Sequence, residues 1–306
     1  MTKSSLSRRA LSLVAASAIA LSACGGNSPV ASSNDAFVVN GVSYSVDSFE
    51  TLLTDLVKSQ QLEAGSNGQA SKQDAISVLR TLLRYEAYKQ YLADNNIEET
   101  SADRSKVEEQ ATSSEGFSSF PQYLQDLLIN LNVAQLTMEK FKAYSASTLE
   151  ELYDDSPAST GVMCMSHILL KTEKDARDVL KELQDGADFA ELAKKRSIEP
   201  AAKQSGGSLA ADDEPCTDLS FFQQQFDGDF MKGAVAAKAG VPTGPVKTQF
   251  GYHIILNHPF SEIKESLIKV AGTKPSVSNL AGYLATADVS INPTYGVWNG
   301  AMSTID

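Results

Sequence analysis

Apolar residues recur every three or four positions through much of the first half of the chain, which is the spacing of helices with one buried face. The stretches with this spacing are 46–61, 72–95 and 118–144. Ahead of them, residues 36–44 alternate between apolar and polar side chains around Asn40-Gly41, a pair typical of a tight hairpin turn. The pattern therefore predicts a mostly helical first half that begins with one small hairpin.

The pattern changes beyond residues 156–161, where Ser, Pro and Gly indicate a boundary between two folding units. Apolar runs of strand length follow at 162–170 and 251–257, with shorter helical stretches between them at 173–183, 187–195 and 229–238. After Pro259 come two weaker helical stretches, 261–270 and 276–285, and an extended segment, 288–298. This order predicts a compact α/β unit after the helical one, and so an α+β fold for the chain.

The start of the chain has the layout of a secretory signal segment. A short basic leader, residues 1–9, precedes an apolar run, residues 10–21, that is too short to span a bilayer. The run leads into Leu-Ser-Ala directly before Cys24, and this stretch resembles the lipobox of bacterial lipoproteins. The resemblance implies a signal peptide over 1–23, lipid attachment at Cys24 and a tether over 24–35. The alternative is an ordinary cleavage site beside an unmodified Cys.

Composition and charge exclude several classes of protein. With 42% hydrophobic, 21% charged and 8% aromatic residues, the chain is neither disordered, nor fibrous, nor a polytopic membrane protein. Its net charge is −12, and outside the leader 23 basic residues face 38 acidic ones, a balance of −15. So acidic a protein repels phosphate backbones, and nucleic acid is not an expected partner.

Several ordered motifs between residues 161 and 259 resemble those of the parvulin family of peptidyl-prolyl cis-trans isomerases. The motifs are Ser166-His167-Ile168-Leu169-Leu170, Gly186-Ala187-Asp188-Phe189 with Leu192-Ala193, Ser197, Ser205-Gly206-Gly207-Ser208-Leu209, and the stretch from Gly244 to Ile255. The resemblance implies an α/β domain with a small antiparallel sheet that catalyses rotation about X-Pro amide bonds. Because that reaction breaks no bond, it requires neither a cofactor nor a metal.

The resemblance also implies which residues form the site. Those that match the polar floor of the family's site, expected to be catalytic, are His167, Glu199, Thr248 and His253. Those that match its apolar cup for the proline ring are Leu209, Phe226 and Phe230. In the family the paired histidines hydrogen-bond to each other as neutral rings. The alternatives are two satisfied interior histidines and ordinary core packing of the aromatic residues, while His258 is expected to be a solvated residue at a strand end.

Two features depart from the family's pattern. The interval from Leu209 to Phe226 is longer than usual, and Ser208 and Ala210 replace an Asp and a Gly of the family's turn. Glu199 stands where the family has Cys or Asp, and its extra methylene can misplace an oriented carboxylate. Reduced activity is therefore an open alternative.

Two further cysteines, Cys164 and Cys216, remain once Cys24 is lipidated. An exported protein matures in an oxidising compartment, so we expect these two thiols to form a disulfide. The alternative is a pair of free buried thiols.

The helical segment before the parvulin unit and the tail after it resemble the chaperone domain of SurA- and PrsA-type foldases. The expected division is a signal peptide at 1–23, a lipid-anchored linker at 24–35, a helical chaperone domain at 36–155, an isomerase domain at 161–259 and a C-terminal segment at 260–306. The C-terminal segment is expected to pack back on the N-terminal domain, with 288–298 as a returning strand. The alternative for 288–298 is an unattached surface tail.

These features together predict a foldase held by a lipid on the extracytoplasmic face of the bacterial cell membrane. Its expected partners are unfolded, newly exported polypeptides that contain X-Pro bonds. The first alternative is a holdase chaperone in which the parvulin unit binds clients without catalysis. A solute-binding lipoprotein is a weaker alternative, because it would need similar strands in both halves of the chain.

Overall fold

The computed structural model describes residues 31–210 and 214–306, so the leader, Cys24 and the first part of the 24–35 linker lie outside the described residues. The α-helices are α1 (Val46–Lys58), α2 (Lys72–Asp94), α3 (Ser101–Thr112), α4 (Gln122–Glu139), α5 (Ala146–Asp155), α6 (Glu173–Gln184), α7 (Phe189–Arg196), α8 (Pro200–Ser205), α9 (Leu219–Gln225), α10 (Gly228–Ala236), α11 (Phe260–Thr273) and α12 (Pro275–Thr286). Two short 3-10 helices are η1 (Phe117–Ser119) and η2 (Pro157–Thr160). The strands are β1 (Asp35–Val39), β2 (Val42–Ser45), β3 (Val162–Met163), β4 (Met165–Leu170), β5 (Thr217–Asp218), β6 (Thr243–Thr248), β7 (Gly251–Asn257), β8 (Val289–Ile291), β9 (Trp298–Asn299) and β10 (Thr304–Ile305).

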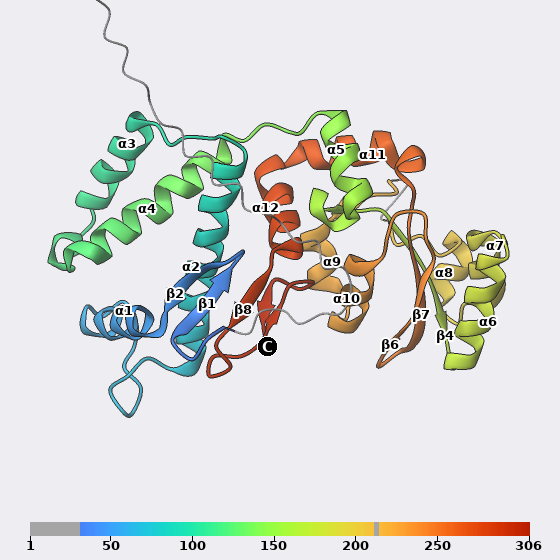
Figure 1. Ribbon diagram of the computed structural model, residues 1–306, viewed down its shortest axis with the longest axis horizontal. Coiled ribbons are helices and arrows are strands. Elements are labelled where there is room, and N and C mark those ends of the chain that lie inside the picture. Colours follow the sequence, from blue (N-terminus) through green and yellow to red (C-terminus); the bar gives the residue numbers. More distant parts are fainter. Residues whose placement is uncertain (1–30, 211–213) are drawn as a thin grey trace, which may run out of the picture.

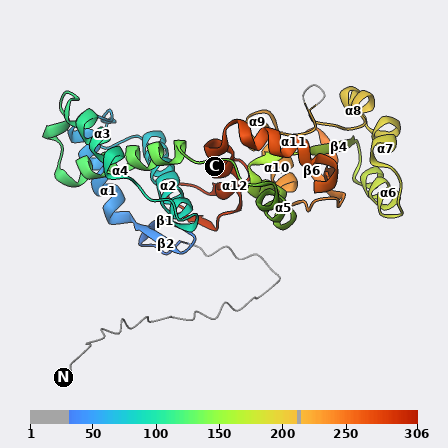
Figure 2. The ribbon, with the colours of Figure 1, turned by 90° about the horizontal axis from the view of Figure 1, so that it is seen from above.

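The described residues form an elongated molecule with two lobes (Figure 1). One lobe contains α1 to α4 with β1, β2 and β8, and the other contains the strands β4, β6 and β7 with α6 to α10. The view from above shows α12 between the two lobes (Figure 2). The α+β fold expected from the sequence is confirmed.

A strand from the far end of the chain completes the sheet of the N-terminal lobe. β1 pairs with β2 through the predicted hairpin, and its other edge pairs with β8, both in antiparallel fashion. In the second pairing Phe37 lies opposite Ile291. The returning strand predicted within 288–298 is therefore present, and it is the three-residue β8.

The predicted N-terminal helices form where amphipathic stretches follow a capping residue. Ser45 and Ser71 cap α1 and α2, each accepting a hydrogen bond from a backbone N–H in the first turn. The apolar stripes of the two helices meet in one core that contains Phe49, Leu79 and Leu83. Across the described residues, no helix combines the length and apolar character needed to cross a bilayer.

Two helices of this region were not predicted. α3 lacks an apolar stripe, since only Asp103 and Val107 are buried along it. α5 is capped by Ser145 and buries Leu149 and Tyr153, in a stretch just before the boundary at 156–161 for which no helix was predicted. Both helices depend on local capping and tertiary contacts rather than on periodicity.

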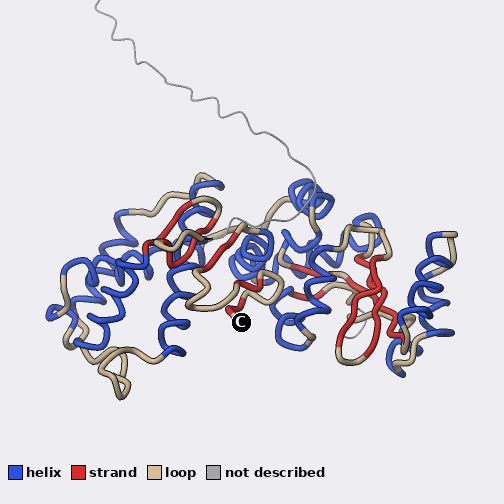
Figure 3. The backbone as a smooth tube through the Cα atoms, turned by 60° about the horizontal axis from the view of Figure 1, so that its bottom comes forward, coloured by secondary structure: helices blue, strands red, loops and turns tan. Residues whose placement is uncertain are grey.

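The sheet of the C-terminal lobe has the order β4-β7-β6 and is antiparallel throughout. The strands lie between helices on both sides (Figure 3). Alternation along β4 places Ile168 and Leu170 in the core with α6 and α7. His167 and Leu169 therefore face the opposite side of the sheet, where α10 packs.

The long interval between Leu209 and Phe226 contains the short strand β5 and the helix α9. β5 pairs with β3, and Cys216, just before β5, forms the expected disulfide with Cys164, just after β3. The bond closes a loop with a sequence separation of 52 residues, which corresponds to a stabilisation of about 4 kcal/mol in the chain-entropy account. It ties the interval to the first strand of the sheet.

The helix α12 joins the two lobes through two different faces. Leu280 and Leu284 belong to the core of the N-terminal lobe, whereas Ala281 and Ala285 pack against the core of the C-terminal lobe. Gly282 lies on the second face, against η2. A Cβ atom at this position would stand 2.1 Å from the carbonyl oxygen of Ser159, so only glycine permits this approach.

We predict that Gly282→Ala lowers the free energy of unfolding by about 1–3 kcal/mol, because backbone atoms of η2 must move to admit the methyl group. Thermal unfolding followed by calorimetry measures the change. Gly272→Ala in α11 is the matched control, since a Cβ there meets no atom within 4 Å. Equal melting temperatures for the two variants would contradict the close contact of α12 with η2.

Candidate active site

A cavity of about 230 Å³ opens on the face of the β4-β7-β6 sheet that α10 covers. The residues that line it are His167, Leu169, Glu199, Gln225, Phe226, Asp227, Phe230, Phe250 and His253. Five of the seven residues expected in the site are in this set. The other two, Thr248 and Leu209, lie behind the lining.

The two histidines face each other across the paired strands β4 and β7. His253 lies opposite Leu169 in the register, which makes it the diagonal neighbour of His167 on one face of the sheet. The two Nδ1 atoms are 3.2 Å apart, and the rings lie nearly parallel, with an angle of 18° between their planes. Only 3% of His167 and 5% of His253 is exposed, so the sheet itself fixes the pair.

A chain of hydrogen bonds runs through both rings from Glu199 to Thr248. Glu199 Oε2 lies 2.5 Å from His167 Nε2, and His253 Nε2 lies 2.9 Å from Thr248 Oγ1. An ionised carboxylate only accepts, so His167 donates from Nε2. With both rings neutral, His167 Nδ1 accepts from the Nδ1–H of His253, and His253 Nε2 accepts from the Thr248 hydroxyl. That hydroxyl itself accepts from the N–H of Phe250 at 3.2 Å. In this arrangement each donor along the hydrogen-bonded series faces an acceptor.

The electrostatics of the site favour the same protonation states. The hydrogen bond with His167 lowers the pKa of the Glu199 carboxyl, although partial burial opposes this. Burial lowers the pKa of His253 to about 4, because the charged ring would lose its hydration, and the neighbouring His167 adds to the effect. At neutral pH the site therefore holds an ionised Glu199 and a neutral His253.

Local contacts with β4 hold Glu199 and His167 in place. The buried Ser197 hydroxyl accepts from the N–H groups of Leu169 and Glu199, at 3.2 and 3.3 Å. The His167 N–H donates to the carbonyl of Gly207 at 2.8 Å, and a Cβ at Gly207 would lie 2.6 Å from the His167 carbonyl oxygen. The extra methylene of Glu199 therefore does not prevent its carboxylate from bonding to His167.

An aromatic wall faces the histidines. The rings of Phe226 and Phe230 lie 5.1 Å apart in a stacked arrangement, and Phe230 points edge-on at His167 and His253, at 5.7 and 5.1 Å. Phe226 ends α9 and Phe230 lies in α10, so the two rings belong to different helices. Asp227, between them, caps α10 and sets the angle of the wall. Leu209 packs in the apolar cluster behind this wall.

Four residues that line the cavity were missed in the sequence: Leu169, Gln225, Asp227 and Phe250. Alternation along the predicted strand 162–170 would have found Leu169, which lies two positions from His167. Asp227 carries the signal of an N-cap ahead of a short helix. Gln225 has no local signal. Phe250 lies within the matching stretch from Gly244 to Ile255, but only the fold shows that the β6–β7 turn reaches this cavity.

His258 does not lie free in solvent at a strand end, as the sequence suggested. Its Nε2 lies 2.8 Å from Ser166 Oγ and its Nδ1 lies 3.3 Å from Glu262 Oε2. Ser166 is only 3% exposed, so this Ser-His-Glu arrangement is a structural contact between β4 and α11. Within residues 31–210 and 214–306, no group of three or more His, Cys, Asp or Glu side chains is arranged to hold a metal ion.

We predict that the His253 ring stays neutral from pH 7 down to about pH 5, which NMR of the imidazole nitrogens measures. In the unfolded chain His253 binds a proton below about pH 6.5, whereas in the native protein the ring binds it only near pH 4. The protein therefore loses stability as the pH falls through this window, by about 3 kcal/mol from this ring. In His253→Asn the melting temperature should depend less on pH between 7 and 5. Titration of His253 near pH 6.5 would contradict the burial argument.

Comparison with known proteins agrees with this geometry. Residues 167–258 match the family model described as rotamase, a PPIC-type PPIase domain. The chain is 41% identical over 109 residues to the foldase protein PrsA of Clostridium kluyveri, which covers 36% of this chain and 29% of that protein. It is 35% identical over 173 residues to PrsA of Clostridium botulinum, which covers 53% of this chain and 49% of that protein.

The chain thus spans half or less of the length of these curated relatives. Among solved structures, PrsA from Bacillus subtilis is similar at 23% identity with a TM-score of 0.28, over 73% of this chain and 91% of that one. The paired histidines, Glu199 and the aromatic wall all lie inside the segment that matches the family model. Residues 167–258 of this chain are a PPIC-type, parvulin-like peptidyl-prolyl isomerase domain.

Proposed function

We propose that this protein is an extracytoplasmic foldase that catalyses cis-trans isomerisation of X-Pro bonds in unfolded, newly exported proteins. The observation that carries the proposal is the cavity, in which an aromatic wall faces a polar floor of hydrogen-bonded groups. The match to the PPIC-type PPIase family and the similarity to PrsA foldases support it.

The aromatic wall suits a reaction that consists of rotation about one amide bond, with a barrier of about 20 kcal/mol. In the planar amide, resonance gives the carbonyl oxygen a partial negative charge that water stabilises. Phe226 and Phe230 would hold the proline ring out of water and so weaken this solvation of the planar form. The twisted amide has lost this resonance and carries less charge on its oxygen. Removal from water therefore raises its free energy less than that of the planar amide. The cavity thereby binds the transition state better than the ground state.

Glu199 is the charged member of the hydrogen-bonded chain. In our proposal its carboxylate lies near the carbonyl oxygen of the bound X-Pro bond and repels the partial charge of the planar amide. The repulsion decreases as the bond twists, which again favours the transition state. His167, His253 and Thr248 are positioning residues, because their hydrogen bonds orient that carboxylate.

A second apolar cavity supports a chaperone activity of the N-terminal lobe. It has a volume of about 220 Å³ and lies between α1, α2 and α4. Its apolar lining consists of Leu52, Leu56, Leu62, Val78, Leu82, Leu124, Leu127, Leu128 and Leu131. We propose that apolar segments of unfolded clients bind there while the isomerase domain acts on their proline bonds. A holdase without catalysis is the alternative.

We predict that loss of the aromatic wall reduces catalysis more than loss of the Glu199 charge, because the wall holds the ring on which every polar effect depends. Phe226→Ala and Phe230→Ala should lower kcat/KM for a short X-Pro peptide by about tenfold or more, and Glu199→Gln by less. NMR exchange spectroscopy measures these rates without a coupling protease.

Phe226→Ala is the cleaner of the two aromatic variants, since Phe226 is half-buried whereas Phe230 is only 1% exposed and packs in the core. Suppression of client aggregation should be unchanged in all three variants, because the N-terminal lobe is intact. If the isomerisation rate with micromolar wild-type protein equals the rate without protein, the isomerase function is rejected and the holdase remains.

We also propose that the mature protein begins at a lipidated Cys24, because a basic leader and a short apolar run precede it. Metabolic labelling with a palmitate analogue should mark the wild-type protein and place it in the membrane fraction. Cys24→Ala should lose both the label and the membrane association. Persistence of either in the variant would show that the anchor lies elsewhere.

A further inference from the structure

The cavity beside the paired histidines, here called the proline cavity, contains two carboxylates that have no Lys or Arg partner. Among the described residues that line it, Glu199 and Asp227 are acidic and none is Lys or Arg. Glu199 pairs with the ring of His167, and the His253 ring is neutral at neutral pH. No Lys or Arg of the lining therefore cancels the charge of these carboxylates, and Asp227 has no ring partner either.

Asp227 is fixed at the aromatic wall by its role as a helix cap. Its Oδ1 accepts from the N–H of Asp229 at 2.9 Å and from that of Phe230 at 3.4 Å. The carboxylate thus stands at the turn between the two rings that would hold proline. Both it and Glu199 act to raise the pKa of His253, against the stronger effect of burial.

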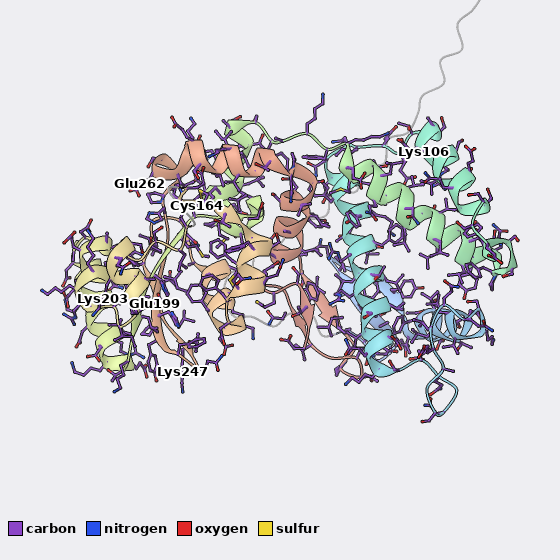
Figure 4. All side chains as sticks on the ribbon, turned by 180° about the vertical axis from the view of Figure 1, so that it is seen from behind. Lys106, Cys164, Glu199, Lys203, Lys247 and Glu262 are labelled. Carbon is purple, nitrogen blue, oxygen red and sulfur yellow. A yellow bond between two sulfur atoms is a disulfide. The ribbon has the colours of Figure 1, made fainter. Side chains whose placement is uncertain are left out.

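The nearest lysines along the chain do not offset this charge. In β6 Thr248 faces His253, so the adjacent Lys247 points to the other face of the sheet. Lys203 is exposed on α8, one turn after Glu199, and forms no ion pair with it. Figure 4 labels these residues on α8 and on the β6 hairpin.

We propose that the cavity selects X-Pro bonds in which X is Lys or Arg, with Asp227 and Glu199 as the residues that determine this specificity. The proposal rests on the isomerase function proposed above. A proline ring held on the wall brings the side chain of the preceding residue close to the two carboxylates. A cationic side chain is attracted there, whereas Glu, Asp or a phosphorylated residue is repelled and leaves its own charge without a partner.

The test compares peptides of the form Ala-Xaa-Pro-Phe in which Xaa is Lys, Ala or Glu, with the full-length protein. For Lys over Glu we expect a preference in kcat/KM of about tenfold at low salt, since both an attraction and a repulsion contribute. The preference should decrease at 0.5 M NaCl, because these partly exposed charges are screened.

Asp227→Asn separates the charge from the cap, because asparagine caps helices as well as aspartate does. We expect this variant to reduce the preference for Lys over Glu by about threefold. Asp229→Asn is the matched control. It removes the same charge two residues further along the chain, from an exposed side chain that does not line the cavity. It should retain the wild-type preference.

Equal rates for the Lys and Glu peptides, or an equal loss of preference in both variants, would overturn the proposal. Peptide binding followed by NMR chemical shifts tests the same preference independently of turnover. If no peptide is isomerised, the proposed enzymatic function fails, but tighter binding of the Lys peptide that depends on Asp227 still supports the charge selection.

Discussion

The architecture depends on one close contact, that of Gly282 in α12 with the backbone of η2. The isomerase domain is inserted between η2 and α11, so its two ends must meet beside the N-terminal lobe. α12 meets this requirement because Leu280 and Leu284 on one face join the N-terminal core, while the glycine face lies flat on Ser159. The pairing of β8 with β1 then closes the lobe from the other end of the chain.

Within the isomerase domain, a single ionised side chain organises the polar groups. Because Glu199 can only accept, His167 donates to it from Nε2, and with both rings neutral this sets the tautomer of His253 and the direction of the Thr248 hydroxyl. Burial keeps His253 neutral, which lets the chain of donors and acceptors persist at neutral and mildly acidic pH. The site is thus preorganised by strand pairing and hydrogen bonding rather than by mobile loops.

Under the proposed foldase function, the two cavities have complementary chemistry for unfolded clients. The groove between α1, α2 and α4 is almost wholly apolar, and the proline cavity combines an aromatic wall with two carboxylates. Together with a net charge of −12, this favours client segments in which apolar residues are accompanied by basic ones. Long-range attraction would bring such chains to the protein, and the apolar surfaces would retain them.

Elements with local signals could be predicted from the amino-acid sequence. The Asn40-Gly41 hairpin, the amphipathic helices α1 and α2 and the paired histidines in their strands could all be predicted, because periodicity, caps and motifs record them. The helix α3 has a cap at Thr100 but no apolar stripe, and nothing local to Phe250 indicates that it lines a cavity, so neither was predicted. Family resemblance predicted that 288–298 returns to the N-terminal domain and that Glu199 shares a site with His167. The specific contacts came from the fold: β8 pairs with β1, Glu199 bonds to His167 Nε2, and Asp227 lies at the cavity. Such contacts depend on chain crossings and close packing, which hydrophobic spacing along a sequence does not specify.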